Sequence, residues 1–220
     1  RKAVAAGVQP ILGAHFDTPG GSLVLLAQTE TGYPNLCALT RIWGEALTER
    51  NIKPRDFLAR GAKDAACSGF DDLICLAGGS QFADDARMGM LDRADRSGRL
   101  HEIMAYLHRT MFPGRFYVQI ARAGAEDQAV LDRQHRIVQA AHDLDVPVVA
   151  AGETFYASPE RHEAYEVVTA IRTKGEVKGD DTGIAATTRQ RFHLRTADDF
   201  AALFQDLPEG IRNTREIAKR

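Results

Sequence analysis

Apolar residues along the chain fall into short runs, which predict strands, and into stripes at helical spacing. The run Val146–Val149 contains three valines and is followed by Gly152, Glu153 and two aromatic residues. Such a run is typical of a strand buried on both faces of a parallel sheet. Because ligands in α/β folds bind just beyond the carboxyl ends of strands, Gly152–Tyr156 is predicted to be one wall of any reactive site.

Four further apolar runs predict strands at 9–16, 22–27, 72–79 and 115–120. Turn residues between the first two of these, Pro19, Gly20 and Gly21, predict a hairpin. The glycine pair at 78–79 fits either a phosphate-binding turn or a position where no side chain can be accommodated.

Stripes at helical spacing predict helices between and after these strands. They cover 84–91, 100–111, 126–144, 198–204 and 209–219, together with a helix that opens near Thr31 and one that begins at Ser158. The stripe of the helix after Ser158 runs through Ala164, Val167, Val168 and Ile171. Strands alternating with helices predict an α/β protein built as a parallel layer or a barrel.

The composition of the chain is consistent with an α/β protein and adds few constraints. The chain has 220 residues, is 44% hydrophobic and 26% charged, and carries a formal net charge of −2. These values fit one ordinary cytoplasmic domain without a signal peptide or membrane span, and the lack of a basic surplus argues against a domain that grips nucleic acid alone. Cys37, Cys67 and Cys75 have no metal-type spacing and are predicted to be small buried hydrophobes.

The start of the chain indicates a fragment. It begins at Arg1 without methionine, and residues 3–8 read as the last turn of a helix closed by a glycine at position 7. We therefore expect an amino-terminal part, including one or more strands, to be missing.

Candidate chemistry is sparse in the residues themselves. No H-E-x-x-H, G-x-S-x-G or P-loop pattern occurs. His15 and Glu153 each follow or end a predicted strand, and a histidine with a carboxylate at one sheet rim could hold zinc or manganese. The residues alone leave that possibility open and predict only an α/β domain.

Six stretches, in order, resemble the amino-terminal PHP (polymerase and histidinol phosphatase) domain of the bacterial DNA polymerase III α subunit. They are AAGVQPILGAHF, LVLLAQTETGYPNLCALT, DLICLAGG, FPGRFYVQIARAG, VPVVAAGETFY and FAALFQDLPEGIRNTREIAKR. The second is the most specific, and it is similar to the family's L-A-x-(N/D)-x-x-G-Y-x-N-L pattern. Residues 182–193 also resemble the error-prone paralogue, so the class within the family stays open.

The resemblance implies a distorted seven-stranded (β/α) barrel over residues 1–195 and a helical connection toward a polymerase body over 196–220. Metal-binding members hold up to three ions at the carboxyl ends of the strands. Their carboxylate in G-x-(E/D)-F corresponds to His15, their cysteine in S-G-C to Gly79, and the aspartate and histidine of N-D-x-H to Glu153 and Phe155. Two ligand positions are therefore lost and two altered, which predicts a degenerate site without catalytic, cofactor-binding or metal-binding residues.

Three hypotheses follow. The first is a structural domain that docks a proofreading exonuclease subunit and other replisome proteins, while DNA and Mg²⁺ are held by polymerase parts outside this chain. The second is an active zinc- or manganese-dependent phosphoesterase or 3′-5′ exonuclease that uses His15 and Glu153. The third is a free-standing phosphatase, against which the polymerase-like stretch at 200–220 argues.

Overall fold

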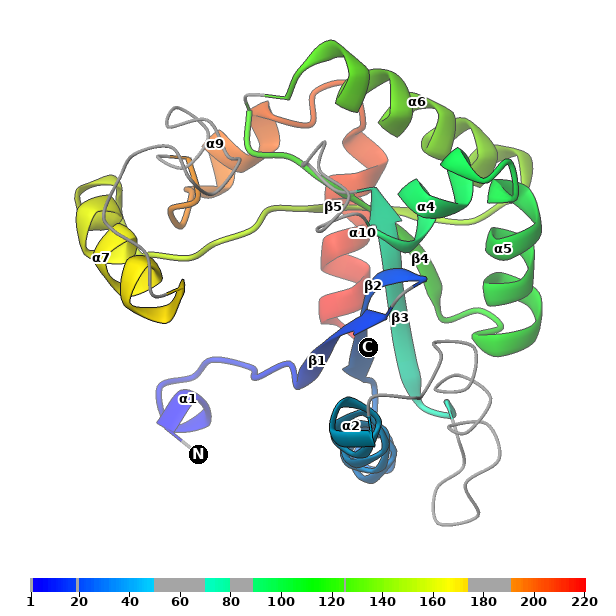
Figure 1. Cartoon of the computed structure of the whole chain (residues 1–220), viewed down its shortest axis with the longest axis horizontal. Helices are drawn as coiled ribbons and strands as arrows, with labels where there is room; N and C mark the ends of the chain where they lie inside the picture. The colour runs from blue at the N-terminus through cyan, green and yellow to red at the C-terminus, as the bar shows by residue number, and fades with distance from the viewer. Residues whose placement is uncertain (1, 19, 50–69, 80–88, 125, 174–190) are drawn as a thin grey trace.

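The computed structural model describes residues 2–18, 20–49, 70–79, 89–124, 126–173 and 191–220. The predicted α/β fold is confirmed: helices surround one five-stranded sheet (Figure 1). The strands are β1 (Gly13–Thr18), β2 (Gly21–Ala27), β3 (Leu73–Gly79), β4 (Phe116–Ala121) and β5 (Val148–Ala151), and they lie side by side in chain order.

The sheet is mixed, because β1, β2 and β3 pair antiparallel whereas β3, β4 and β5 pair parallel. The predicted hairpin joins β1 to β2. It is closed by the Thr18 hydroxyl, which donates to the carbonyl oxygen of Gly21 at 2.7 Å, and by the positive φ of 108° at Gly21. Within the described part of the chain, β1 pairs only with β2 and β5 only with β4, so closure into a seven-stranded barrel stays an expectation.

Most helices lie close to their predicted positions, but the helix at 90–96 begins six residues and ends five residues after the predicted helix 84–91. The helices are α1 (Lys2–Ala5), α2 (Gly32–Glu49), α4 (Met90–Arg96), α5 (Leu100–Tyr106), α6 (Gln128–Asp143), α7 (His162–Thr173), α9 (Ala197–Ala202) and α10 (Pro208–Ala218). The predicted helix 100–111 is α-helical only to Tyr106 and continues as the π-helix η2 (Leu107–Met111), and α7 is preceded by the 3₁₀ turn η3 (Pro159–Arg161). Most of the predicted helix 84–91 lies outside the described residues.

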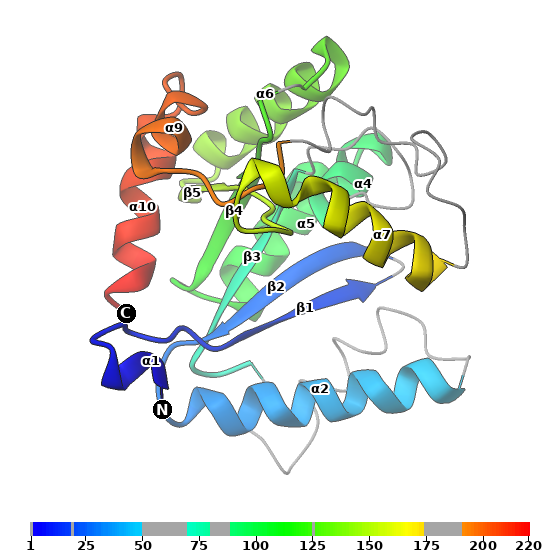
Figure 2. The same ribbon diagram turned by 90° about the vertical axis from the view of Figure 1, so that its left-hand side faces the viewer.

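Apolar side chains cover both faces of the central strands, as the valine run predicted. On one face Leu25, Cys75 and Val118 belong to the main core, which α2, α4, α5 and α6 complete. On the other face Ile74, Tyr117 and Val149 pack against Ile217 of α10. Figure 2 shows α2 and α10 with the sheet between them.

Gly78 lies inside β3 rather than in a turn. A Cβ atom there would overlap the carbonyl oxygen of Gln119 on β4, because the two backbones approach closely at this point. The glycine at position 78 therefore meets a packing requirement, the second of its two interpretations.

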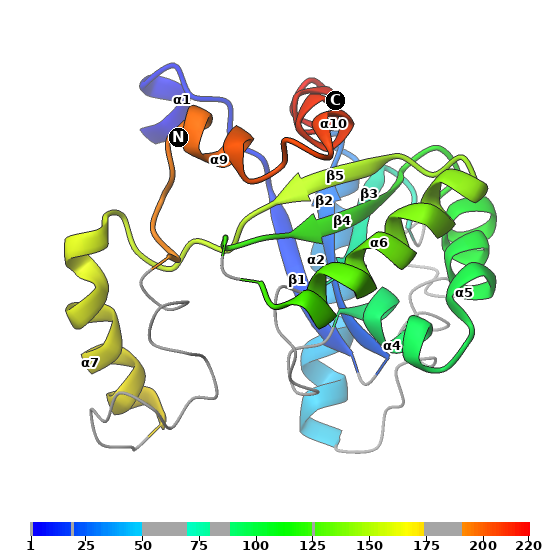
Figure 3. The same cartoon turned by 90° about the horizontal axis from the view of Figure 1, so that it is seen from above.

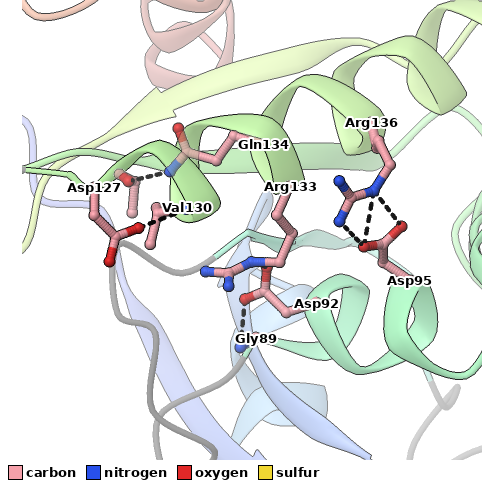
Figure 4. A network of polar contacts seen from close by, with 9 residues as sticks. Gly89, Asp92, Asp95, Asp127, Val130, Arg133, Gln134 and Arg136 are labelled. Carbon is pink, nitrogen blue, oxygen red and sulfur yellow. Dashed lines mark hydrogen bonds and ion pairs between the residues drawn. The ribbon is translucent and has the colours of Figure 1, made fainter.

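Two ion pairs join α4 to α6 (Figure 4). Asp92 is fully buried, accepts from the Gly89 amide at 3.0 Å and pairs with Arg133 at 2.7 Å. One turn further along, Asp95 pairs with Arg136, also at 2.7 Å, but the Arg136 side chain is 58% exposed. The two helices are thus held in register by one buried and one solvent-facing contact.

Candidate functional site

The carboxyl ends of β3, β4 and β5 form one rim of the sheet. Gly79 pairs with Ile120 and Ala121 pairs with Ala151, so the three strands end at the same edge of the sheet. This is the edge at which ligands bind in parallel α/β folds, and Gly152–Tyr156 leaves β5 there.

His15 lies away from that rim. It pairs with Val24, which pairs with Leu76, which in turn pairs with Tyr117 near the start of β4. Its Nε2 atom lies 3.4 Å from a carboxylate oxygen of Asp17, and these two side chains are 56% and 81% exposed. His15 is therefore a solvent-exposed residue of β1 whose imidazole contacts Asp17.

Glu153 is exposed and follows the end of β5 by two residues. Through the pairs described above, His15 is level with Tyr117 of β4. The next residue, Val118, is the first residue of β4 that pairs with β5. By register, His15 is therefore level with the middle of β3 and with the start of β5, whereas Glu153 lies beyond the end of β5. Among the residues that the structure describes, no group of three or more His, Cys, Asp or Glu could hold a metal ion.

Gly79 and Phe155, the two positions where the family resemblance places a cysteine and a histidine ligand, carry no donor atom in their side chains. Phe155 stacks on Tyr165 with ring centroids 5.3 Å apart and an 8° interplanar angle, and it meets Phe192 edge-on at 5.1 Å. Its amide donates to the Phe192 carbonyl at 2.8 Å. The side chains at the rim therefore do not fit a centre of several metal ions.

These aromatic rings form a cluster of their own beyond β5, composed of Phe155, Tyr156, Tyr165 and Phe192. Tyr156 and Phe192 are 8% and 1% exposed, and Tyr156 forms a parallel bridge with His193. Burial raises the pKa of the Tyr156 hydroxyl. The end of β5 is thus tied to the segment at 191–194 by aromatic packing and backbone hydrogen bonds.

Arg122 directly follows β4, and no pattern in the sequence indicated a role for it. Arg122 is 8% exposed and donates two hydrogen bonds, of 2.5 and 2.9 Å, to the carboxylate of Asp206. It also donates to Gln134 of α6 and to the Leu203 carbonyl, at 3.1 and 2.9 Å. These hydrogen bonds from Arg122 lower the pKa of Asp206.

Both partners lie in stretches that carried the family resemblance, which is the one signal that could have drawn attention to them. Their separation of 84 residues gives no local pattern from which a pair could be read. The arrangement fixes the rim to the carboxyl-terminal helices and uses most of the guanidinium donors, so it suits a structural role rather than substrate binding.

The cysteines agree only in part with their predicted burial. Cys75 is buried in β3, where burial raises the pKa of its thiol. Cys37 is exposed on α2, so that prediction was wrong for this residue. Its place in the helix turns it away from the stripe formed by Leu36, Leu39 and Ile42. Cys67 lies outside the described residues.

Comparison with known proteins identifies similar sequences along the whole chain. A family profile for the PHP domain matches residues 1–123. The chain is 34% identical to the DNA polymerase III subunit alpha of Caulobacter vibrioides and 33% identical to that of Pseudomonas aeruginosa, and it is 28% identical to the error-prone DNA polymerase of Symbiobacterium thermophilum. These alignments cover 98% to 100% of this chain but only 18% to 20% of the relatives.

Proposed function

The chain belongs to the PHP domain family, and we propose that it is the PHP portion of a bacterial DNA polymerase III α-type subunit in which the metal site has degenerated. In this role it stabilises the polymerase and docks a proofreading exonuclease subunit within the replisome. The polymerase relatives, matched from end to end of this chain, support the first part of the proposal.

One observation carries the proposal of a degenerate site: Phe155 occupies a former histidine position and is engaged by Tyr165 and Phe192. Phosphoester hydrolysis by several metal ions needs oxygen and imidazole ligands in a fixed geometry. An aromatic ring packed against Tyr165 and Phe192 supplies none, and Gly79 supplies no side chain.

DNA contact and nucleotidyl transfer, with its Mg²⁺, belong in this proposal to parts of the polymerase outside the 220 residues. A net charge of −2 supports that assignment, because a surface that binds DNA on its own needs excess positive charge. No helix within the described ranges is both long and apolar enough to cross a membrane. A replisome subunit works in the cytoplasm, and we place this protein there.

A second candidate function is a metal-dependent phosphoesterase or 3′-5′ exonuclease. It is favoured by Glu153, which places a carboxylate just beyond β5, at the position where the family resemblance implies an aspartate ligand. In that case zinc or manganese would be held with the help of Glu153 and His15.

The test is metal analysis of the purified full-length protein, together with a 3′-5′ exonuclease assay with and without chelator. We expect less than 0.1 zinc or manganese ion per chain and no nuclease activity above that of Glu153→Ala. Glu163→Ala serves as the control, because Glu163 is an exposed carboxylate on α7. One ion or more per chain, with nuclease activity lost in Glu153→Ala and retained in Glu163→Ala, would establish the second candidate instead.

A further inference from the structure

Helix α7 presents its apolar side to solvent. Ala164, Val167, Val168 and Ile171 follow the i, i+3, i+4, i+7 spacing and therefore share one face, here called the outer face of α7. Val167, Val168 and Ile171 are 46%, 62% and 74% exposed. An amphipathic helix of a globular domain normally turns such a stripe toward the core, so this orientation requires an explanation.

The opposite face of α7 explains why the helix cannot simply rotate. Tyr165 stacks on Phe155, and the His162 side chain, 13% exposed, lies 3.4 Å from Glu166. Turning the outer face inward would break the aromatic stack that ties α7 to the end of β5. In Figures 1 and 3 this helix lies apart from the sheet and from the helices that cover it.

The outer face has the properties of a permanent contact. Its four residues are small or β-branched and none carries a charge, so a second helix can approach closely and pack along the stripe. Contacts that form and dissociate are generally more polar, whereas obligate interfaces resemble a domain core cut in half. An uncharged aliphatic stripe therefore favours a partner that is always present.

We propose that the outer face of α7 packs against an apolar helix from another part of the same polymerase polypeptide. This rests on the proposed function. The occupant is indicated by the length of the relatives, because about four-fifths of each lies outside the region that matches this chain. A segment of the same polypeptide is covalently linked to α7, so its contact with α7 is intramolecular and takes place at high effective concentration.

The experiment compares hydrogen exchange in the full-length protein with and without the paired substitutions Val168→Asp and Ile171→Asp. In the wild-type protein the α7 amides are protected, and in the paired variant their exchange is at least tenfold faster. Val168→Leu with Ile171→Leu keeps the surface apolar and retains the protection. Ala129→Asp, at an exposed position of α6, introduces the same charge elsewhere and leaves α7 protected.

Hydroxyl-radical footprinting of the wild-type protein tests the proposal without any variant. Val168 and Ile171 are expected to be oxidised at least fivefold more slowly in the native full-length protein than in its peptides. Equal rates would overturn the proposal. So would protection that grows with protein concentration, which indicates a second copy, or that needs an added exonuclease subunit.

Template-directed nucleotide incorporation by the same preparation tests the proposed function separately. If incorporation is present and α7 is unprotected, only the docking inference fails. If incorporation is absent, the polymerase assignment fails and the docking inference falls with it.

Discussion

Arg122 shows how a single buried cation can organise the rim of the sheet. Its guanidinium lies at the end of β4, over the ring of Phe204 at 5.1 Å, and is held by hydrogen bonds to α6 and to the segment before α10. A buried guanidinium is tolerated only where its donors are satisfied. Asp206 supplies the compensating charge, and its own side chain remains 51% exposed.

Replacing Asp206 by asparagine should lower the free energy of unfolding by about 1–2 kcal/mol at pH 7. A buried charged donor would lose its counter-charge, although solvent around Asp206 screens part of the loss. Because the pKa of Asp206 is lowered in the folded protein, its contribution is present above the unfolded value of about 4. That contribution is lost as the pH falls through the folded value.

Urea unfolding of both proteins at pH 7 and in acid measures this difference. The wild-type and Asp206→Asn stabilities should converge as the pH drops below about 4. Asp198→Asn, at an exposed position of α9, is the control and should change stability by less than about 0.5 kcal/mol. A difference that stays constant down to low pH would show that the ion pair is not its source.

At the scale of elements, the spacing of apolar residues predicted the strands and the long helices, because these depend on local sequence. All five strands and the long helices were found because buried strands need unbroken apolar runs and helices need stripes. The turn residues at 19–21 predicted a hairpin and therefore the antiparallel direction of β2. No pattern in the sequence predicted that residues 107–111 form a π-helix. The orientation of α7 could not be foreseen either, because Tyr165 and Phe155 meet only in the folded chain.

For the candidate site, only the family resemblance indicated more than two residues. His15 and Glu153 were chosen because each lies near a predicted strand end, but strand order and register decide whether two ends meet, and neither can be read from spacing. Here the register separates them. Conversely, Arg122 and Asp206 are joined by two hydrogen bonds, and no pattern in their local sequences indicates that they pair.

The two contacts between α4 and α6 provide a matched comparison. Asp92→Ala should lower the free energy of unfolding by about 3–5 kcal/mol, because it removes a fully buried carboxylate that pairs with the buried guanidinium of Arg133. Asp95→Ala removes the same group one turn away and should cost about 1 kcal/mol or less, because Arg136 can turn to water. Chemical denaturation of both variants measures the difference. Equal losses would mean that burial does not set the strength of these pairs.

At the scale of the whole molecule, residues 196–220 are an integral part of the fold. Phe204, Leu207 and Ile217 are 1%, 4% and 9% exposed, and the Asn213 amide donates to the Val148 carbonyl at 2.6 Å. Gly210 lies so close to β5 that a Cβ there would be 3.1 Å from the Ala150 nitrogen. Near the other end of the chain, Gln9 donates to the Ala218 carbonyl at 3.1 Å.

Ending the chain after Arg195 should therefore abolish cooperative unfolding. The shortened chain would expose Ile74, Tyr117 and Val149 on one face of the sheet and would leave Arg122 without Asp206. Each large buried side chain that is lost lowers the free energy of unfolding by about 2–5 kcal/mol, and the sum exceeds the stability of a typical domain. Calorimetry and near-ultraviolet circular dichroism of chains 1–195 and 1–220 test this. Removal of residues 1–7, which include no buried side chain among those described, is the control at the opposite end and should leave the melting transition cooperative. If chain 1–195 melts cooperatively near the temperature of chain 1–220, the carboxyl-terminal helices are an attachment to the domain rather than part of its core.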